Sequence, residues 1–284
     1  AGFDDSHTRS FYQLLIKNGD CLVNGKTVKP SYKVKAGDEV FIKEIPLKEV
    51  DIEPEDILLD ILYEDSDLLI VNKPKDMVVH PAPGHEKGTL VNAVMYHCKN
   101  DLSGINGELR PGIVHRIDKD TTGSLIICKN DETHVAIAEQ IKEHSVNRIY
   151  EGIIVGNPKD DTGVINGPIG RNEKDRKKMA INHKNGKDAC THYEIIERYK
   201  GYAYARFKLE TGRTHQIRVH MASIGHPILG DPLYGGESKK FKTEGQVLHA
   251  RIIGFIHPRS KEYIEVEAPL PAYFTHLLEV MRGL

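Results

Sequence analysis

The chain has 284 residues, of which 39% are hydrophobic and 28% are charged, a composition typical of a soluble globular protein. Its length allows one large domain and one small domain. No apolar run approaches the ~20 residues that a transmembrane helix needs, which excludes a helical membrane protein. A formal net charge of −2 argues against a protein that coats nucleic acid with its whole surface, although a local basic face is compatible with it.

The cysteines and histidines predict no metal centre. Cys21, Cys98, Cys128 and Cys190 lie far apart and form no C-x-x-C pair. We therefore expect reduced, buried thiols in a cytoplasmic protein, with neither zinc nor a disulfide framework. The histidines include no H-E-x-x-H motif. The chain starts with Ala-Gly-Phe-Asp-Asp and has no initiator Met or signal peptide, so we interpret it as trimmed at its N-terminus.

Residues 1–47 are predicted to form a small unit of their own. Helical spacing covers 9–17, Asn24-Gly25 predicts a tight hairpin within 21–28, and a strand follows at 39–45. This order resembles the alpha-L RNA-binding module, without the leading helix that the module usually has. A generic small α/β cap is the alternative interpretation.

The rest of the chain, 61–284, is predicted to be one large α+β domain, preceded by an acidic, aperiodic linker at 48–60. A β-hairpin is expected over 61–71. Apolar patterns predict helices at 89–98, 132–143, 214–223 and 271–281, and strands at 124–128, 148–155, 191–196, 202–209, 252–256 and 263–267. Because strands dominate and do not alternate regularly with helices, we expect a mixed, mainly antiparallel sheet.

One acid, Asp118, stands just before a predicted buried strand. It belongs to the segment His-Arg-Ile-Asp-Lys-Asp-Thr-Thr-Gly at 115–123, which the apolar run 125–128 follows closely. A carboxylate at the start of a core strand is costly unless another group pairs with it. A candidate partner lies about a hundred residues later, in the basic segment 211–220. For an isolated Asp, a structural ion pair that holds a loop is the simpler interpretation.

Three motifs follow one another along the large domain. The first is Val-Asn-Lys-Pro at 71–74 with Val-Val-His-Pro at 78–81, and the second is the segment around Asp118. The third is Thr-Gly-Arg-Thr-His-Gln-Ile-Arg-Val-His at 211–220, followed by Gly-His-Pro-Ile-Leu-Gly-Asp at 225–231. Together they resemble the RluA-type pseudouridine synthases, most closely the branch that modifies large-subunit ribosomal RNA. The family usually has Gly where Asp76 stands here, and Asp tolerates the left-handed backbone that such a turn needs.

The resemblance implies three catalytic residues. Asp118 matches the nucleophile, and carboxylates serve as covalent nucleophiles at sugar centres. Arg218 is expected to keep Asp118 charged, because a neighbouring guanidinium favours the carboxylate form, and Thr214 is expected to cap the helix that carries it. Tyr150 matches the active-site Tyr, whose ring can stack on uracil and whose hydroxyl can serve in proton abstraction. Without the motifs, Tyr150 would be interpreted as half-buried strand packing.

The resemblance also implies RNA contacts. A uridine cannot react inside a stacked stem, so we expect it to be flipped out, with Arg116 filling the gap. Arg213 and His215 are expected to contact phosphate or support the site. The segment 171–187 carries seven Lys or Arg against two acids, and phosphate contact is predicted for it. The residues expected to make these contacts are Lys174, Arg176, Lys177 and Lys178. A solvated loop is the alternative for this segment, and a rim ion pair is the alternative for Arg116.

The implied enzyme is an isomerase that needs neither metal nor cofactor, acts on RNA away from membranes, and works as a monomer. Two other interpretations compete with it. Residues 118–122 fit D-x-D-x-T, the nucleophile loop of aspartyl-phosphate phosphatases, but no apolar strand precedes them and the later acidic pair for Mg²⁺ is incomplete. A non-catalytic RNA-binding or ribosome-assembly factor would not need Asp118, Tyr150 and Arg218 together. The sequence does not indicate which uridine is modified.

Overall fold

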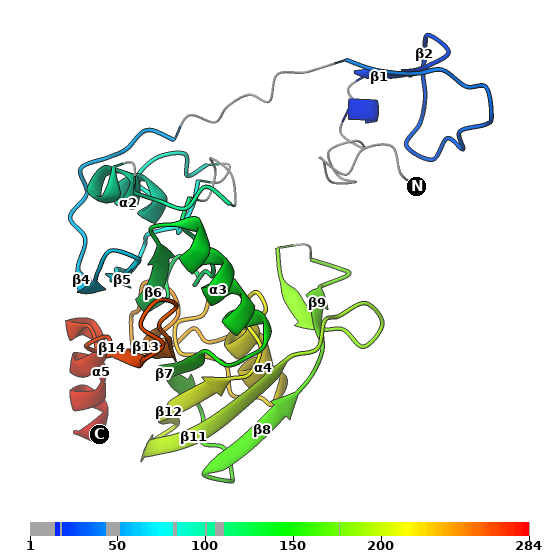
Figure 1. Ribbon diagram of the computed structural model, residues 1–284. Helices are drawn as coiled ribbons and strands as arrows, with labels where there is room; N and C mark the ends of the chain where they lie inside the picture. The colour runs from blue at the N-terminus through cyan, green and yellow to red at the C-terminus, as the bar shows by residue number, and fades with distance from the viewer. Residues whose placement is uncertain are drawn as a thin grey trace. The chain divides into compact units, whose positions relative to one another are not determined.

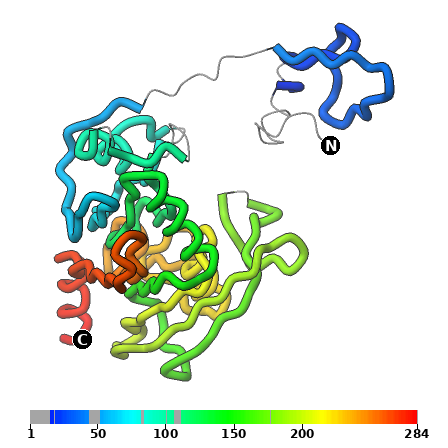
Figure 2. The backbone as a smooth tube through the Cα atoms, viewed as in Figure 1, coloured from blue at the N-terminus to red at the C-terminus, as the bar shows by residue number. Residues whose placement is uncertain are grey.

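The computed structural model describes residues 15–17, 19–43, 52–81, 84–99, 101–105, 111–175 and 177–283. The chain separates into two compact units, Ala1–Asp51 and Ile52–Leu284. Figure 1 and Figure 2 show the course of the backbone in both units. Within the described ranges, no helix is long and apolar enough to cross a bilayer.

The first unit contains a small antiparallel sheet built on an Asn-Gly hairpin. Its strands are β1 (Cys21–Val23), β2 (Lys26–Thr27) and β3 (Val40–Ile42), in the order β2-β1-β3. Between β1 and β2, Asn24 and Gly25 have φ angles of 51° and 74°, as a type I′ turn requires. The predicted hairpin is confirmed, whereas most of the helix predicted over 9–17 lies outside the described residues.

The second unit is built around a nine-stranded sheet (Figure 1). Its strands are β4 (Ile61–Glu64), β5 (Leu68–Lys73), β6 (Thr122–Cys128), β7 (Asn147–Val155), β8 (Thr162–Asn166), β11 (Cys190–Tyr199), β12 (Tyr202–Leu209), β13 (Leu248–Ile256) and β14 (Tyr263–Glu267). They are ordered β4-β5-β6-β13-β7-β12-β11-β8, with β14 also paired to β13. Among the strand pairs that the structure describes, β6–β13 alone is parallel. A separate hairpin of β9 (Ile169–Arg171) and β10 (Met179–Ile181) carries the basic segment.

Strand β13 lies inside the sheet and pairs with three other strands along its two edges. One edge of β13 pairs with β7. On the other edge, His249 and Ala250 of β13 pair with β6, and residues 252–256 of β13 pair with β14. The contact with β6 depends on Gly123, which has a φ of 110° and whose added Cβ would lie 2.3 Å from the carbonyl oxygen of Ala250. The loop that ends at Gly123 is thereby fixed to the centre of the sheet.

Two helices sandwich β5 and β6. Helix α2 (Leu90–Cys98) contributes Leu90, Val91 and Val94 to the core on one face, and α3 (Asp131–Lys142) contributes Ile137 on the other. The two strands are therefore buried on both faces, which explains their unbroken apolar sequences. Helix α2 begins with a capping box, in which Thr89 and Asn92 satisfy each other's backbone N–H groups.

Two further helices cover β7 and β12. Ile217 of α4 (Gln216–Ser223) packs on Phe207, on the same sheet face as α2. Phe274 of α5 (Ala272–Arg282) packs on Ile153 and Tyr204 on the opposite face. The space between α2 and α4 on their common face is where the loop before β6 emerges, beside Tyr150, which contacts both of these cores.

The observed elements confirm the predicted α+β fold with a mixed, mainly antiparallel sheet. Strands β12 and β14 have the predicted bounds, and helices α2, α3 and α5 lie within one residue of theirs. Strands β8, β9 and β10 were not predicted, because they are short and alternate weakly between buried and exposed residues. The helix predicted at 214–223 begins only at Gln216.

The linker predicted at 48–60 differs from the structure over its second part. Ile52 is buried in the core beneath α2. The N–H of Glu55 donates to the carbonyl oxygen of Asn92, and the N–H of Asn72 donates to that of Asp60. The prediction missed these contacts because residues 52–60 form no helix or strand, so no periodic sequence pattern marks them as part of the domain. These residues belong to the second unit.

A buried histidine makes the stability of the second unit depend on pH. His249 Nδ1 accepts from the Thr122 hydroxyl at 2.7 Å and its Nε2–H faces the Ala268 carbonyl at 3.2 Å, so both ring nitrogens are satisfied in the neutral form. Burial lowers the pKa of His249 from 6.5 to about 4.

Acid should therefore destabilise the fold through His249. As the pH falls below about 6.5 the unfolded chain takes up this proton, and the folded chain does not until about pH 4. Above pH 6.5, where His249 is neutral in the folded and the unfolded chain, the residue gives the free energy of unfolding no pH dependence. Between pH 6.5 and pH 4 its effect lowers the free energy of unfolding by about 3 kcal/mol. Urea unfolding at several pH values measures it. The His249→Asn variant should show a shallower pH dependence, and equal slopes in both proteins would contradict the assignment.

Candidate active site

A tight loop presents Asp118 at the start of β6. The N–H of Thr121 donates to the carbonyl oxygen of Asp118 at 3.0 Å, and Ile117 is buried in the core beneath α2. Gly123 fixes the end of the loop against β13. With its neighbours anchored in this way, the Asp118 side chain stays near the surface, 17% exposed.

A buried lysine ties this loop to the turn after β5. Lys73 Nζ donates to the carbonyl oxygens of Pro74, Met77 and Lys119 at 2.7, 2.8 and 2.9 Å. In the same turn Asp76 has a φ of 63°, which confirms the left-handed backbone predicted there. Burial lowers the pKa of Lys73 to about 7, against the attraction of nearby carboxylates. The first two sequence motifs therefore meet through one side chain.

Arg218, on the first turn of α4, pairs with Asp118 as predicted. Its Nη1 donates to Asp118 Oδ2 at 2.7 Å, and its Nε and Nη2 donate to both oxygens of Asp231 at 2.6 and 2.9 Å. Only 4% of Arg218 and none of Asp231 is exposed. Burial acts to lower the pKa of Arg218, but the two carboxylates outweigh it and raise that pKa. The guanidinium is therefore permanently charged beside Asp118.

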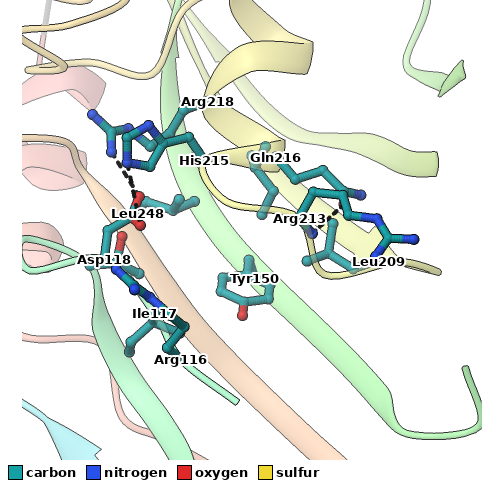
Figure 3. Close-up of a pocket in the computed structure, with 12 residues that line it drawn as sticks. Arg116, Ile117, Asp118, Tyr150, Leu209, Arg213, His215, Gln216, Arg218 and Leu248 are labelled. Carbon is teal, nitrogen blue, oxygen red and sulfur yellow. Dashed lines mark hydrogen bonds and ion pairs between the residues drawn. The ribbon is translucent and has the colours of Figure 1, made fainter. Parts of the chain in front are cut away.

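Tyr150 faces the same pocket from the sheet. It lies on β7, opposite Phe207 of β12 and Ala250 of β13. Figure 3 shows its ring on the floor of the pocket, with Asp118 and Arg218 at one side. Burial raises the pKa of Tyr150, so its hydroxyl carries its proton at neutral pH.

His215 occupies the position before α4 in an unusual conformation. It is the N-cap residue with φ 57° and ψ 22°, and it makes no side-chain capping bond. The prediction that Thr214 caps this helix is wrong, because the chain enters α4 through a left-handed residue. The ring of His215 lies between Tyr234, whose hydroxyl is 2.9 Å from Nδ1, and Asp118, whose Oδ1 is 3.7 Å from Nε2. Burial lowers the pKa of His215.

These side chains enclose a small pocket of about 50 Å³ (Figure 3). Leu209 and Leu248 supply its apolar walls together with Ile117. A larger cavity of about 440 Å³ adjoins it, sharing Asp118 and Arg218 and extending past Val79 and Leu233. The pocket thus combines an aromatic ring and aliphatic walls with one carboxylate and several cations, and a larger cavity adjoins it.

The structure separates the predicted RNA-binding residues into two groups. Arg116, Arg213 and His215 line the pocket beside Asp118. The predicted contacts on the β9–β10 hairpin lie apart from the pocket, and Arg176 is outside the described residues. Of the hairpin residues that the structure describes, Lys174 and Lys177 are exposed and Lys178 is half-buried.

Sequence reasoning missed two groups that organise the pocket. Asp231 clamps Arg218, and the Gln216 side chain accepts from the Arg213 N–H at 2.9 Å and the Thr211 hydroxyl at 2.8 Å. Both belong to motifs that the sequence analysis quoted. A signal for Asp231 was its place in Gly-Asp-Pro-Leu-Tyr, a turn segment in which an acid commonly bonds to backbone N–H groups.

Two clusters in the described chain have the composition of metal sites, and neither lines the pocket. In one, His192 Nε2 lies 2.5 Å from Glu210 Oε1 beside Cys190. In the other, Asp65, Asp67 and His257 come together. The oxygens of Asp67 already bind Arg259 and Asn130. The four cysteines are free thiols, and Cys190 is partly exposed, unlike the buried thiol predicted there, because it lies at the end of β11.

Comparison with known proteins assigns the chain to a family. The model of the family described as RNA pseudouridylate synthase matches residues 67–223, the stretch that carries Asp118, Tyr150 and Arg218. The S4 domain model matches residues 6–40, within the segment predicted to be an RNA-binding module.

Curated relatives match almost the whole chain. The "Uncharacterized RNA pseudouridine synthase YlyB" of Bacillus subtilis is 49% identical over 99% of this chain and 92% of its own length. The "Ribosomal large subunit pseudouridine synthase D" of Zymomonas mobilis is 47% identical over 90% and 84%. The protein of the same name in Escherichia coli is 41% identical over 98% and 87%.

A solved structure supports the fold independently. Human RNA Pseudouridylate Synthase Domain Containing 1 superposes with a TM-score of 0.62 at 24% identity, covering 81% of this chain and 97% of that one. At this identity the likeness concerns the fold alone, whereas the family model and the curated relatives extend over the pocket residues. The chain belongs to the RNA pseudouridylate synthase family and is an RNA pseudouridine synthase, an isomerase.

Proposed function

We propose that this enzyme converts uridines of large-subunit ribosomal RNA to pseudouridine, with Asp118 as the nucleophile. The observation that carries the mechanism is the 2.7 Å contact between Arg218 Nη1 and Asp118 Oδ2 beside Tyr150. The substrate class is supported by relatives named for the large ribosomal subunit, 41–47% identical over most of this chain.

The reaction needs one group that attacks the sugar and later leaves it. An oxygen of Asp118 bonds to C1′ of the uridine, and the bond from C1′ to N1 of uracil breaks, with its electron pair staying on the base. The base turns so that C5 faces C1′, a C5–C1′ bond forms, and the ester bond to Asp118 breaks. Loss of the proton on C5 and gain of a proton on N1 complete an isomerisation in which atoms and electrons balance.

Arg218 supports the first step by holding Asp118 charged and aimed. Its guanidinium is fixed by Asp231 on two other nitrogens, so the donor toward Asp118 does not reorganise during the reaction. Tyr150 offers a flat ring on which uracil stacks. Because its hydroxyl is protonated at neutral pH, it can accept the C5 proton only as it passes its own proton on.

The arrangement outside the pocket fits an RNA chain. The pocket holds a base only if the target nucleotide leaves its helix. Arg116 is exposed and lines the pocket, which supports its proposed role in filling the vacated space. The cations of the β9–β10 hairpin and the S4 domain supply phosphate contacts away from the reacting bond.

Asp118→Asn should abolish turnover while leaving the fold intact, because the amide keeps the shape of the side chain but cannot act as a carboxylate nucleophile. Tritium release from uracil-labelled ribosomal RNA transcript measures turnover, and thermal unfolding checks the fold. Asp120→Asn is the control, since Asp120 lies two residues away in the same loop and should keep most of the activity. An Asp118→Asn rate within about tenfold of the native rate would sink the nucleophile assignment.

Arg218→Ala should lower the single-turnover rate far more than RNA affinity. It should also lower the free energy of unfolding by about 3–5 kcal/mol, because the buried carboxylate of Asp231 loses its counter-ion. Arg213→Ala is the comparison, since the Arg213 side chain donates from Nε to the backbone oxygen of Asp188 and is partly exposed. If Arg218→Ala weakens RNA binding and leaves the rate unchanged, Arg218 is a phosphate contact instead.

Neutralising four cations of the hairpin should weaken RNA binding and flatten its salt dependence. The residues changed to Gln are Lys174, Arg176, Lys177 and Lys178. Each phosphate contact with looped RNA contributes a slope of roughly −0.7 in log K against log salt, so the slope should change by up to about 3. The single-turnover rate at saturating RNA should be retained.

A control variant changes two lysines outside the hairpin, Lys159 and Lys200, to Gln. Both are exposed, and Lys200 lies in the turn between β11 and β12, at the end of these strands away from the pocket residue Leu209. The control variant should keep the native salt slope. An unchanged slope in the hairpin variant would mean that its cations are solvated surface and that the RNA docks elsewhere.

A further inference from the structure

We propose that the turn from Asp231 to Tyr234 is the positioning element of the reaction, with Asp231 acting through Arg218 and Tyr234 acting through His215. Each end of the turn fixes one of the two groups that face the oxygens of Asp118. This inference rests on the proposed role of Asp118 as nucleophile. It adds two residues to that site that do not touch the substrate themselves.

Asp231 is completely enclosed and completely satisfied. Its Oδ2 accepts from Arg218 Nε at 2.6 Å, and its Oδ1 accepts from Arg218 Nη2 at 2.9 Å and from the N–H groups of Leu233 and Tyr234 at 2.9 and 3.2 Å. None of the residue is exposed. With four donors around it, the carboxylate has one orientation, and it transmits this orientation to the guanidinium.

The clamp leaves Arg218 one direction in which to act. Two nitrogens of the guanidinium are engaged by Asp231, and Nη1 points to Asp118. When Asp118 forms an ester with the sugar it loses its negative charge, and a buried Arg218 without another partner would be strongly destabilised. Asp231 makes no bond to the substrate, so Arg218 keeps this partner and its position while Asp118 alternates between carboxylate and ester.

Tyr234 fixes the proton of His215. The hydroxyl oxygen of Tyr234 accepts from the N–H of Met179 at 2.9 Å, which leaves its single hydrogen to be donated to His215 Nδ1, also 2.9 Å away. A neutral imidazole that accepts at Nδ1 carries its hydrogen on Nε2. That N–H faces Asp118 Oδ1 at 3.7 Å, which is too long for a hydrogen bond and short enough for a small movement of the carboxylate to close.

The backbone of His215 supports a functional purpose for this contact. A left-handed conformation is strained for a non-glycine residue and persists only where the surroundings enforce it. Tyr234 enforces it through the hydrogen bond and an edge-to-face ring contact, with centroids 5.8 Å apart. With helical backbone angles at residue 215, the ring would turn away from Asp118. The strained backbone therefore brings the imidazole to the reacting carboxylate.

Close packing and backbone hydrogen bonds hold the turn in one position. Gly230, with a φ of 78°, has no room for a side chain, because a Cβ would lie 1.9 Å from Thr243 Oγ1. A Cβ on Gly236 would lie 1.6 Å from the carbonyl oxygen of Ile228. Backbone bonds from Asp231 N–H to Ile228 and from Gly236 N–H to Asp231 close the segment. The position of both ends of the turn is therefore set by the packing behind it.

A double-mutant cycle tests the Asp231 half of the proposal. Asp231→Asn should lower the single-turnover rate at saturating RNA by about 100-fold, the scale of a misplaced catalytic group, with RNA affinity within about twofold of native. Combined with Arg218→Ala, the same change should cost less than about twofold more, because Asp231 acts only through Arg218. A purely structural residue would show its full effect in both backgrounds, and that result, or a native rate for Asp231→Asn, overturns this half.

Tyr234→Phe tests the other half and also decides the question if Asp231→Asn does not fold. Removing one hydroxyl should lower the single-turnover rate about tenfold, leave RNA affinity unchanged, and have no further effect in a His215→Ala background. Tyr202→Phe is the control, because its hydroxyl makes an equivalent 2.9 Å bond to Ser238 away from the pocket. A native rate for Tyr234→Phe, or an equal loss in both backgrounds, overturns the proposal. Activity retained by Asp118→Asn would instead overturn the proposed function.

Discussion

The candidate active site depends on one guanidinium held between two acids. Arg218 donates to Asp118 through one nitrogen and to Asp231 through two others. Two carboxylates and one cation leave a net charge of −1 in a largely buried place, and removal of Arg218 would leave two unpaired charges there. The exposure of the acids differs, 17% for the Asp118 side chain and none for Asp231. One acid is therefore available to a substrate, and the other is enclosed.

The fold brings these three charged groups together from distant parts of the chain. Asp118 arrives on the loop fixed by Gly123 and Lys73, Arg218 arrives on α4, and Asp231 arrives on the turn that follows. Tyr234 in that turn also receives the N–H of Met179 in β10. The hairpin that carries the basic segment is thus hydrogen-bonded to Tyr234, which also contacts His215 of the pocket.

The elements that the sequence predicted well have strong local patterns. Strand β12 alternates buried and exposed residues between clear turn signals, and α2 begins at a capping box, so their bounds follow from neighbouring residues alone. Strands β9 and β10, by contrast, were not predicted, because they have three residues each and form a hairpin outside the main sheet. The predicted start of α4 was wrong because His215 has a left-handed backbone and contacts Tyr234 of another segment, a contact that no local pattern records.

By itself, the sequence determined the family, the α+β class and the identity of Asp118, Tyr150 and Arg218 as the candidate site, because each stands in a contiguous motif. The tertiary structure alone decided which acid holds Arg218 and which hydroxyl pairs with His215. A buried ion pair depends on the distance and desolvation of two groups after folding, and one sequence records neither quantity. Asp231 therefore looked like an ordinary turn acid until packing placed it, fully buried, against the guanidinium.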